Sequence, residues 1–461
     1  MLRQSALFTI AVLAGCVFLR AQSADPAALT LAQAVEAAAK NYPSIRVSQE
    51  QMNAAAEGIR LARTAYLPRV DALAQVNRAT RNNVFGLLLP QNVIPSMSGP
   101  VIGSNNTGTV WGSALGAIAS WEPFDFGLRQ ANVATAEATK AQAESSVKRS
   151  QFEVLAATID AYLTLAAAQE MVRTSQVGVE RGETLLRMTD ALVNAQLRPG
   201  SDSSRAQAEL AGARTQLIQS RQAVEVARAA LSPFVGLAPS QIAISAPALL
   251  QSPPQQTPVQ ADFRSNPVTL EQDATLEQAR MQLRAMERSY FPKFSLQAAV
   301  YARGTGSETD GARLGGLNGL APTVQDFALG FSVTFPIMDL PALHAREAMQ
   351  AATIRAQTAR SEQIVLELRT RWNVALAQLQ GATEVSESTP VEVSAARDAL
   401  QQTSARYQAG LATIEPVAEA QRLLAQAEID DTLSHLAVWR ALLGLATAAG
   451  DLQPFVVEAG K

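Results

Sequence analysis

The stretch RTAYLPRVDALAQVNR at residues 63–78 has a close counterpart in RSYFPKFSLQAAVYAR at residues 288–303. In both, a helix-like run reaches an aromatic residue and then a proline, Pro68 or Pro292. Hydrophobic and polar residues alternate strictly after the proline, which is the two-residue period of a half-buried strand. Proline lacks a backbone N–H and clashes with the preceding helical turn. Each proline therefore marks the end of a helix and the start of a strand.

The chain repeats one plan twice. Pro43 and Tyr66 are separated by 23 residues, and so are Pro267 and Tyr290, which sets an offset of 224 between the halves. Further along, the offset falls to 213 or 214, as shown by Pro123 with Pro336, Gln207 with Gln421 and Gly236 with Gly450. The difference in length lies in the loop between the strands, where such changes are tolerated most easily. The sequence thus predicts an internal two-fold repeat.

Each half contains two segments of alternating character. The apolar positions of the first, third and fourth segments are Val70, Ala72, Ala74 and Val76, then Phe294, Leu296, Ala298, Val300 and Ala302, then Phe327, Leu329, Phe331, Val333 and Phe335. In the second segment, Trp111 and Trp121 fall on one face, and ten residues in a tilted strand separate them by roughly 25 Å. That is the height of the apolar band of an outer-membrane barrel with its aromatic girdles. Two tryptophans in the core of a soluble sheet would give the same pattern.

Four strands leave two open edges, which hydrocarbon does not tolerate, and bacterial barrels contain at least eight strands. We therefore expect several copies to share one barrel. Residues 80–110 and 304–323 are rich in Gly, Asn, Ser and Pro and lie where long outer loops belong.

The N-terminal residues indicate export. A basic start, the apolar run at 6–19 and small residues up to Ser23 form a signal peptide, while Leu13-Ala14-Gly15-Cys16 also fits a lipobox. Cleavage near Ser23 and lipidation of Cys16 are the two alternatives. Cys16 is the only cysteine, so the exported part has no disulfide. With 38 basic and 41 acidic residues interspersed, the chain is not expected to bind nucleic acid.

The remaining segments predict long helices with coiled-coil-like spacing, including one over about 129–197. The expected division is a signal peptide at 1–23, a first repeat at 24–231 with strands at about 67–78 and 111–122, a proline-rich linker at 232–266 with a short strand at 241–245, a second repeat at 267–450 with strands at about 293–303 and 325–335, and a tail at 451–461. The fold class is therefore mainly α with a transmembrane β-barrel portion.

Over almost the whole exported part, the sequence resembles the TolC-like outer-membrane efflux family. The resemblance rests on LTLAQAVEAAAKNYPSI at 29–45, AYLPRV at 65–70, WEPFDFGLRQANV at 121–133, YFPKF at 290–294 and RYQAGLATIEPVAEAQRLLAQAE at 406–428. It implies a homotrimer with a twelve-stranded barrel, continued by a helical tunnel, or α-barrel, across the periplasm. It also implies a passive exit duct that serves an inner-membrane transporter and a periplasmic adaptor protein.

The family closes the periplasmic end of the tunnel with acidic residues and a tyrosine–arginine network. The resemblance assigns this constriction to Tyr407, to the acids Glu419 and Asp202, and to Glu415, which lies beside Pro416, where the family often has aspartate. Ala412 occupies the position of a latching arginine in some members. Rings of carboxylates would favour cations, although acids at these positions also stabilise helix N-termini in their own right.

Other functions find less support in the sequence. His344 and His435 are the only histidines and are expected to be structural or surface residues, so we predict no metal site and no cofactor. The sequence contains no phosphate-binding glycine loop and no catalytic signature, so an enzyme is not expected. The main alternative is an exported coiled-coil structural or surface protein without channel activity, which leaves the paired strands unexplained. A periplasmic adaptor would not contain the duplicated helical plan.

Overall fold

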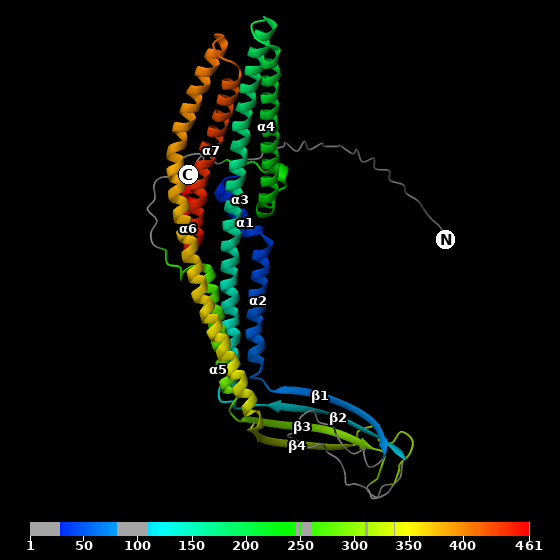
Figure 1. Ribbon diagram of the computed structural model, residues 1–461. Coiled ribbons are helices and arrows are strands. Elements are labelled where there is room, and N and C mark those ends of the chain that lie inside the picture. Colours follow the sequence, from blue (N-terminus) through cyan, green and yellow to red (C-terminus); the bar gives the residue numbers. More distant parts are fainter. Residues whose placement is uncertain are drawn as a thin grey trace, which may run out of the picture.

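The computed structural model describes residues 28–80, 108–245, 249, 261–308, 312–335 and 337–460. Long helices run side by side, and a four-stranded sheet lies at one end of them and bends away from their direction (Figure 1). The turns that join the paired long helices lie at the opposite end. The described part of the molecule is therefore elongated, with strands at one end and helical turns at the other.

Both halves of the chain share the order helix, two strands and two long helices, and α1 precedes this order in the first half. The first half contains α1 (Leu31–Asn41), α2 (Pro43–Thr64), β1 (Arg69–Thr80), β2 (Thr109–Trp121), α3 (Leu128–Asn194), α4 (Gly200–Val235) and the 3-10 turn η1 (Pro239–Gln241). The second contains α5 (Pro267–Arg288), β3 (Lys293–Thr305), β4 (Val324–Thr334), η3 (Ile337–Asp339), α6 (Leu340–Gln408), α7 (Glu415–Ala449) and α8 (Gln453–Ala459). This order confirms the predicted repeat and the mainly helical fold with four strands.

The two longest helices form the framework. α3 has 67 residues and α6 has 69, so each is about 100 Å long. α3 packs against α2, α4, α5 and α7, while α6 packs against α5 and α7. No helix in the described residues has an apolar stretch long enough to cross a membrane.

The shorter helices stack end to end beside the long ones. In the first half, the ring of Tyr42, between α1 and α2, stacks on Phe234 near the end of α4, with 5.0 Å between ring centroids. In the second half, Asn266 caps α5 by accepting from the N–H of Val268, and its side-chain amide donates to the carbonyls of Thr447 and Ala448 at the end of α7. The junction at the start of the helix that leads to the strands is thus held by ring stacking in the first repeat and by hydrogen bonds in the second.

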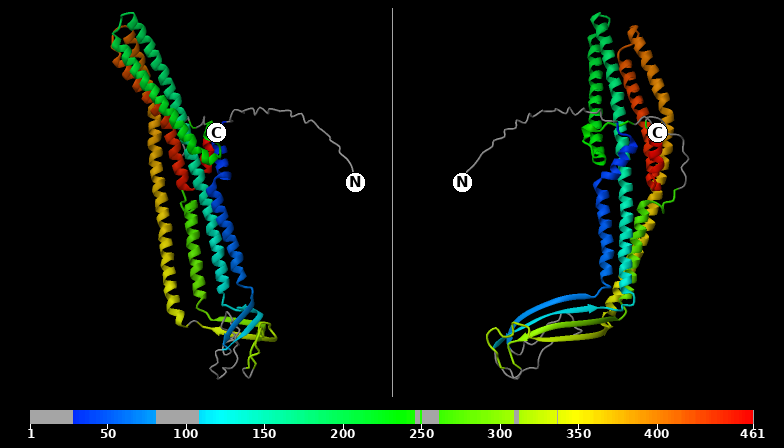
Figure 2. Two further views of the ribbon diagram at one scale, coloured as in Figure 1. Left: turned by 90° about the vertical axis from the view of Figure 1, so that its right-hand side faces the viewer. Right: turned by 180° about the vertical axis from the view of Figure 1, so that it is seen from behind.

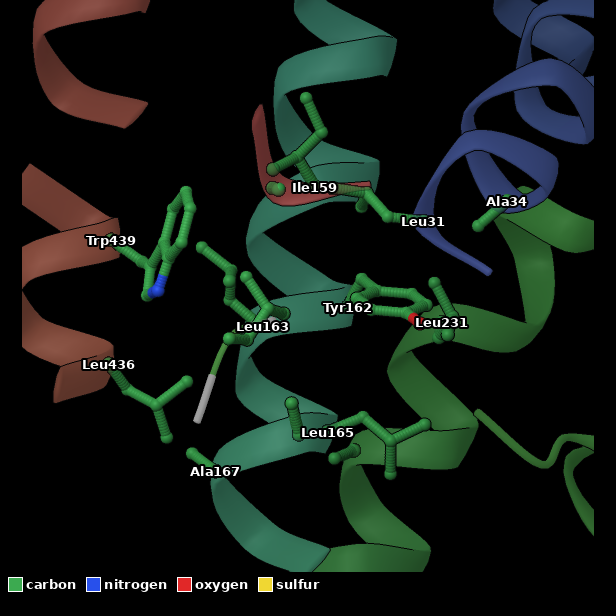
Figure 3. Packing of buried hydrophobic residues seen from close by; sticks show 14 of the residues in the cluster. Leu31, Ala34, Ile159, Tyr162, Leu163, Leu165, Ala167, Leu231, Leu436 and Trp439 are labelled. Carbon is green, nitrogen blue, oxygen red and sulfur yellow. The ribbon is translucent and has the colours of Figure 1, made fainter. Parts of the chain in front are cut away.

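The main hydrophobic core lies midway along the helices, where α1, α3, α4, α7 and α8 meet (Figure 3). Leu163 and Leu436 are buried there, and Trp439 contacts Phe455 of α8 edge to face. Tyr162 is fully buried, and its hydroxyl donates to the carbonyls of Leu29 and Ser245. Burial raises the pKa of Tyr162 to about 12, so the hydroxyl stays protonated as a donor. The core therefore ties the linker to the long helix.

The sheet is antiparallel in the order β1-β2-β3-β4. The register places Val70 opposite Ala119, Trp121 opposite Leu296, and Leu296 opposite Phe331, so the apolar positions share one face. This face is open, with Phe327 83% exposed and Leu329 72% exposed. The other face carries the Arg303–Asp326 ion pair and a small buried cluster of Ala114, Ile118, Ala299 and Tyr301. The alternation predicted from the sequence is therefore confirmed.

Some segments differ from their sequence-based expectation. α4 continues to Val235, four residues into the expected linker. Instead of a strand at 241–245, the chain forms η1 and one isolated parallel bridge between Leu29 and Ile244. Most of the expected tail forms α8, with Phe455 buried. The predicted signal peptide, Cys16 and most of the 80–110 loop lie outside the described residues.

The turns after α3 and α6 have the same hydrogen-bond pattern. The N–H of Leu197 donates to the carbonyl of Leu192, and the N–H of Leu411 donates to that of Arg406, as in a Schellman motif. The residue before each leucine has positive φ. It is Gly410 with φ 78° in the second turn but Gln196 with φ 58° in the first. A side chain in this conformation is disfavoured, whereas glycine adopts it freely.

We therefore predict that Gln196→Gly stabilises the protein by about 0.5–1 kcal/mol, because it removes the left-handed strain of a residue with a Cβ. The matched substitution Gly410→Gln should destabilise it by a similar amount. The midpoint of thermal loss of helical circular dichroism, measured in detergent, should rise in the first variant and fall in the second. Shifts of the same sign in both variants would contradict this account of the turns.

Candidate functional site

The tips of the two helical hairpins, α3–α4 and α6–α7, lie beside each other at the end of the molecule far from the sheet (Figure 2). They share one buried cluster of Leu185, Ala206, Tyr407, Ile414 and Val417. Because these residues come from all four helices or their turns, the position of one hairpin is coupled to that of the other.

Tyr407 is the centre of the contact between the tips. It is fully buried, and its hydroxyl donates to Oδ2 of Asp202 across a distance of 3.0 Å. The guanidinium of Arg198 lies 4.5 Å from the centre of the Tyr407 ring, and its Nη2 donates to the Tyr407 carbonyl at 2.6 Å. Burial, together with the hydrogen bond to Asp202, raises the pKa of Tyr407, although the hydroxyl of Thr189 acts in the opposite direction. The phenol is therefore protonated near neutral pH and acts as a donor.

The two exposed acids of the predicted constriction have different partners. Glu415 pairs with Arg205 of the first hairpin, with 2.8 Å between Oε1 and Nη1. Glu419 pairs with Arg422 of its own helix. The structure thus brings Asp202 and Tyr407 together and uses Glu415 as a second link between the hairpins, whereas Glu419 makes its ion pair within α7.

The arginines of this site were missed by the sequence analysis. With the offset of 214, Arg198 aligns with Ala412 and Asp202 aligns with Pro416. The second tip has Ala412 where some members of the family have arginine, and Pro416 where the family often has aspartate. The first tip has Arg198 and Asp202 at the equivalent positions. The repeat offset was the signal that identifies Arg198, while no motif pointed to Arg205.

A third link lies further down the hairpins. The guanidinium of Arg181 in α3 makes a two-pronged contact with the carboxylate of Glu428 in α7, with 3.0 Å between Nη1 and Oε1. The two side chains are only 22% and 19% exposed. Arg397 of α6 approaches the same carboxylate at 3.9 Å. A two-pronged arginine–carboxylate pair fixes orientation as well as distance, so α3 and α7 are held in one register here.

The two tryptophans of β2 mark the ends of the apolar face. Trp121 is 40% exposed, and its indole N–H donates to the carbonyl of Tyr66, whereas Trp111 lies under the guanidinium of Arg78 at 5.1 Å. At the Trp121 end, a chain of aromatic contacts runs through Phe124, Phe126, Phe291, Phe294 and Phe331. The sequence analysis named the tryptophans but missed this phenylalanine cluster, although four of its five members lie in the motifs WEPFDF and YFPKF.

The start of α3 is fixed by a buried ion pair. Asp125 accepts from the backbone N–H groups of Gly127 and Arg129 and pairs with the Arg129 guanidinium at 2.9 Å. Arg129 also donates to the carbonyl of Ala65 at the end of α2 and covers the ring of Tyr66. Burial opposes ionisation of Asp125, but the hydrogen bonds from Arg129 and Gly127 outweigh it and lower the pKa of the carboxyl.

Comparisons with known proteins agree with this architecture. The family model described as outer membrane efflux protein matches residues 34–237 and 264–451. No curated protein shows significant sequence similarity to the chain.

Among solved structures, the open state of the MtrE outer membrane channel of Neisseria gonorrhoeae is 19% identical, with a TM-score of 0.71 over 92% of this chain and 89% of MtrE. The Campylobacter jejuni CmeC outer membrane channel is 14% identical, with a TM-score of 0.71 over 94% and 89%. The outer membrane protein VceC of Vibrio cholerae is 17% identical, with a TM-score of 0.70 over 91% and 96%. These structures show the same fold.

The Asp125 pair leads to a prediction about pH. Because the pKa of Asp125 is lower in the folded protein, its stabilisation is complete above the unfolded pKa of about 4 and is lost as pH falls toward the folded pKa. Asp125→Asn should lower the thermal midpoint at pH 7, as expected for loss of about 1–2 kcal/mol of capping and pairing.

The difference between wild type and Asp125→Asn should shrink as the pH is lowered from 6 to 3. Asp160→Asn is a suitable control, because the Asp160 side chain is 63% exposed and lies 4.0 Å from Arg440. A difference that stays constant over this pH range would show that the Asp125 charge is not what stabilises the junction.

Proposed function

The chain belongs to the outer membrane efflux protein family, and we propose that it is the exit duct of a tripartite system, supplied by an inner-membrane transporter through a periplasmic adaptor protein. The protein is a non-enzymatic outer-membrane efflux channel with a TolC-like fold. The alternative of a coiled-coil structural protein without channel activity is therefore set aside. Passive conduction agrees with the absence of a nucleotide-binding motif from the sequence.

The edges of the sheet support assembly as a homotrimer. β1 and β4 occupy the two ends of the strand order, so each has one edge that no described strand of the same chain covers. A strand in hydrocarbon must have both edges paired. Three copies, with β4 of one protomer next to β1 of the following protomer, give a closed barrel of twelve strands. The helices would then continue the duct into the periplasm as a tunnel.

The contact between the hairpin tips carries the proposal of a gate. Of the three links, Tyr407 with Asp202 is the most buried, Arg205 with Glu415 the most exposed, and Arg181 with Glu428 intermediate. All three join the first hairpin to the second, so movement of either hairpin away from the other breaks them together. The closed state is therefore held by several modest interactions, and a docked partner can offset them by binding.

The charge at the tip is largely compensated. Asp202, Glu415 and Glu419 are each accompanied by a guanidinium, from Arg198, Arg205 and Arg422 respectively. Arg198 reaches Asp202 through Tyr407, which both residues contact. A ring of free carboxylates would select cations strongly, whereas a ring of compensated pairs should do so weakly.

Tyr407→Phe tests the gate directly. Removing a buried hydrogen bond to a charged group costs about 1.5–3 kcal/mol, which shifts an equilibrium between closed and open states roughly 10- to 150-fold toward the open state. Single-channel recording in planar bilayers should therefore show a large increase in open probability. Tyr162→Phe removes an equally buried hydroxyl in the central core and should leave the open probability unchanged. Equal gating by Tyr407→Phe and wild type would refute the gate.

Arg205→Ala tests the charge compensation. Without its partner, Glu415 leaves one uncompensated carboxylate per protomer, so the reversal potential in a salt gradient should shift toward cation selectivity. The double variant with Glu415→Ala should return to the wild-type value. If Arg205→Ala leaves the reversal potential unchanged, Glu415 does not line the conducting path.

A further inference from the structure

A cluster of three donor atoms lies at the junction between the helices and the sheet in the second repeat. It consists of the phenol of Tyr290, just after α5, and the side chains of His344 and Glu347 in the first turns of α6. Tyr290 Oη lies 2.7 Å from Oε2 of Glu347 and 3.2 Å from Nδ1 of His344. The remaining separation, between His344 Nδ1 and Glu347 Oε2, is 3.8 Å.

The two repeats build this junction from different residues. Tyr66 is the counterpart of Tyr290 in the first repeat, and there the ring is covered by Arg129, which is buried and paired with Asp125. In the second repeat the partners are instead solvent-accessible, with the side chain of His344 70% exposed and that of Glu347 39% exposed. One junction thus has a buried structural ion pair, and the other has an accessible set of imidazole, carboxylate and phenol.

The size of the triangle decides what this set can bind. Three atoms with these separations lie on a circle of about 1.9 Å radius, and Zn²⁺ or Cu²⁺ takes nitrogen and oxygen ligands at about 2.0–2.2 Å. An ion could therefore contact all three atoms while lying slightly out of their plane, with its outer side open to water.

The electrostatics of the cluster also suit a cation. The carboxylate of Glu347 lies 2.7 Å from the phenol oxygen of Tyr290. It places negative charge beside that oxygen. A divalent ion at this position would replace the phenol proton, which would pass to solvent as the oxygen–metal bond forms.

We propose that Tyr290, His344 and Glu347 form a binding site for a late first-row divalent metal ion, with Cu²⁺ bound more tightly than Zn²⁺. The preference follows from the affinity order of divalent ions for nitrogen and oxygen ligands. The site joins the end of α5 to the start of α6, so the bound ion stabilises the junction. The proposal does not depend on the gate or on the cargo of the duct.

The test uses the full-length protein in detergent, without a histidine tag, titrated with CuCl₂ or ZnCl₂ in a calorimeter. We expect one ion per protomer and tighter binding of Cu²⁺. The Cu²⁺ complex should show a phenolate-to-copper charge-transfer band and nitrogen coupling in its electron paramagnetic resonance spectrum. His344→Ala and Glu347→Gln should each weaken binding by about tenfold or more. Tyr290→Phe should abolish the charge-transfer band.

Two controls separate this site from other contacts of the metal. His435→Ala removes the other histidine, which lies in α7, and Tyr66→Phe removes the equivalent phenol of the first repeat, so both should bind as wild type does. Without metal, all variants should melt at the wild-type midpoint, because the cluster lies at an accessible surface. Absence of stoichiometric binding, unchanged affinity in His344→Ala, or persistence of the charge-transfer band in Tyr290→Phe would each overturn the proposal.

Discussion

The backbone hydrogen bonds at the edges of the sheet are the constraint on which the rest of the molecule depends. A chain with four strands in a row satisfies the inner edges by itself, and no described strand of the same chain covers the outer edges of β1 and β4. In hydrocarbon an unpaired edge costs several kcal/mol for each N–H or C=O group, so the strands are stable there only as part of a closed barrel. The apolar face, with its exposed Phe327 and Leu329, is suited to lipid for the same reason.

The helices are connected directly to the strands, so the ends of the strands set where the helices begin and end. Each strand pair is joined to helices at a junction where an aromatic residue and a proline end the helix, and in the first repeat the Asp125–Arg129 pair holds the start of α3 against the end of α2. From there α3 and α6 run unbroken to the tips, so a small tilt at the junction becomes a large displacement at the far end. In the proposed trimer, contacts such as Tyr407 with Asp202 would therefore control the width of the tunnel although they lie far from the sheet.

Sequence reasoning succeeded where the signal is local. The prolines, the alternating segments and the repeat offset are properties of short stretches, and they predicted the strands and the order of the helices. At the tip, the resemblance pointed to Tyr407 and Asp202, which are hydrogen-bonded to each other, while their role in a constriction stays a prediction. Arg198 was missed although the repeat offset identifies it, whereas Arg205 was missed because its partner Glu415 comes from the other hairpin and only tertiary packing sets that register. Tyr290 and His344 meet across 54 residues for the same reason, through packing of α5 on α6. The expected strand at 241–245 was wrong, because this extended run beside prolines forms only one isolated bridge, between Ile244 and Leu29.

The most direct test of the account is disulfide cross-linking between the outer edges of the sheet. Cys16 is the only cysteine of the chain, so cysteines introduced in pairs, one at an outward position of β1 such as Ala74 and one at an outward position of β4 such as Leu329, report only on this contact. Scanning neighbouring outward positions covers the register between copies. The account predicts that, for at least one pair, oxidation in the membrane produces a covalent closed trimer, while each single cysteine gives none. Efficient folding into the membrane with no cross-link at any register would contradict the shared barrel.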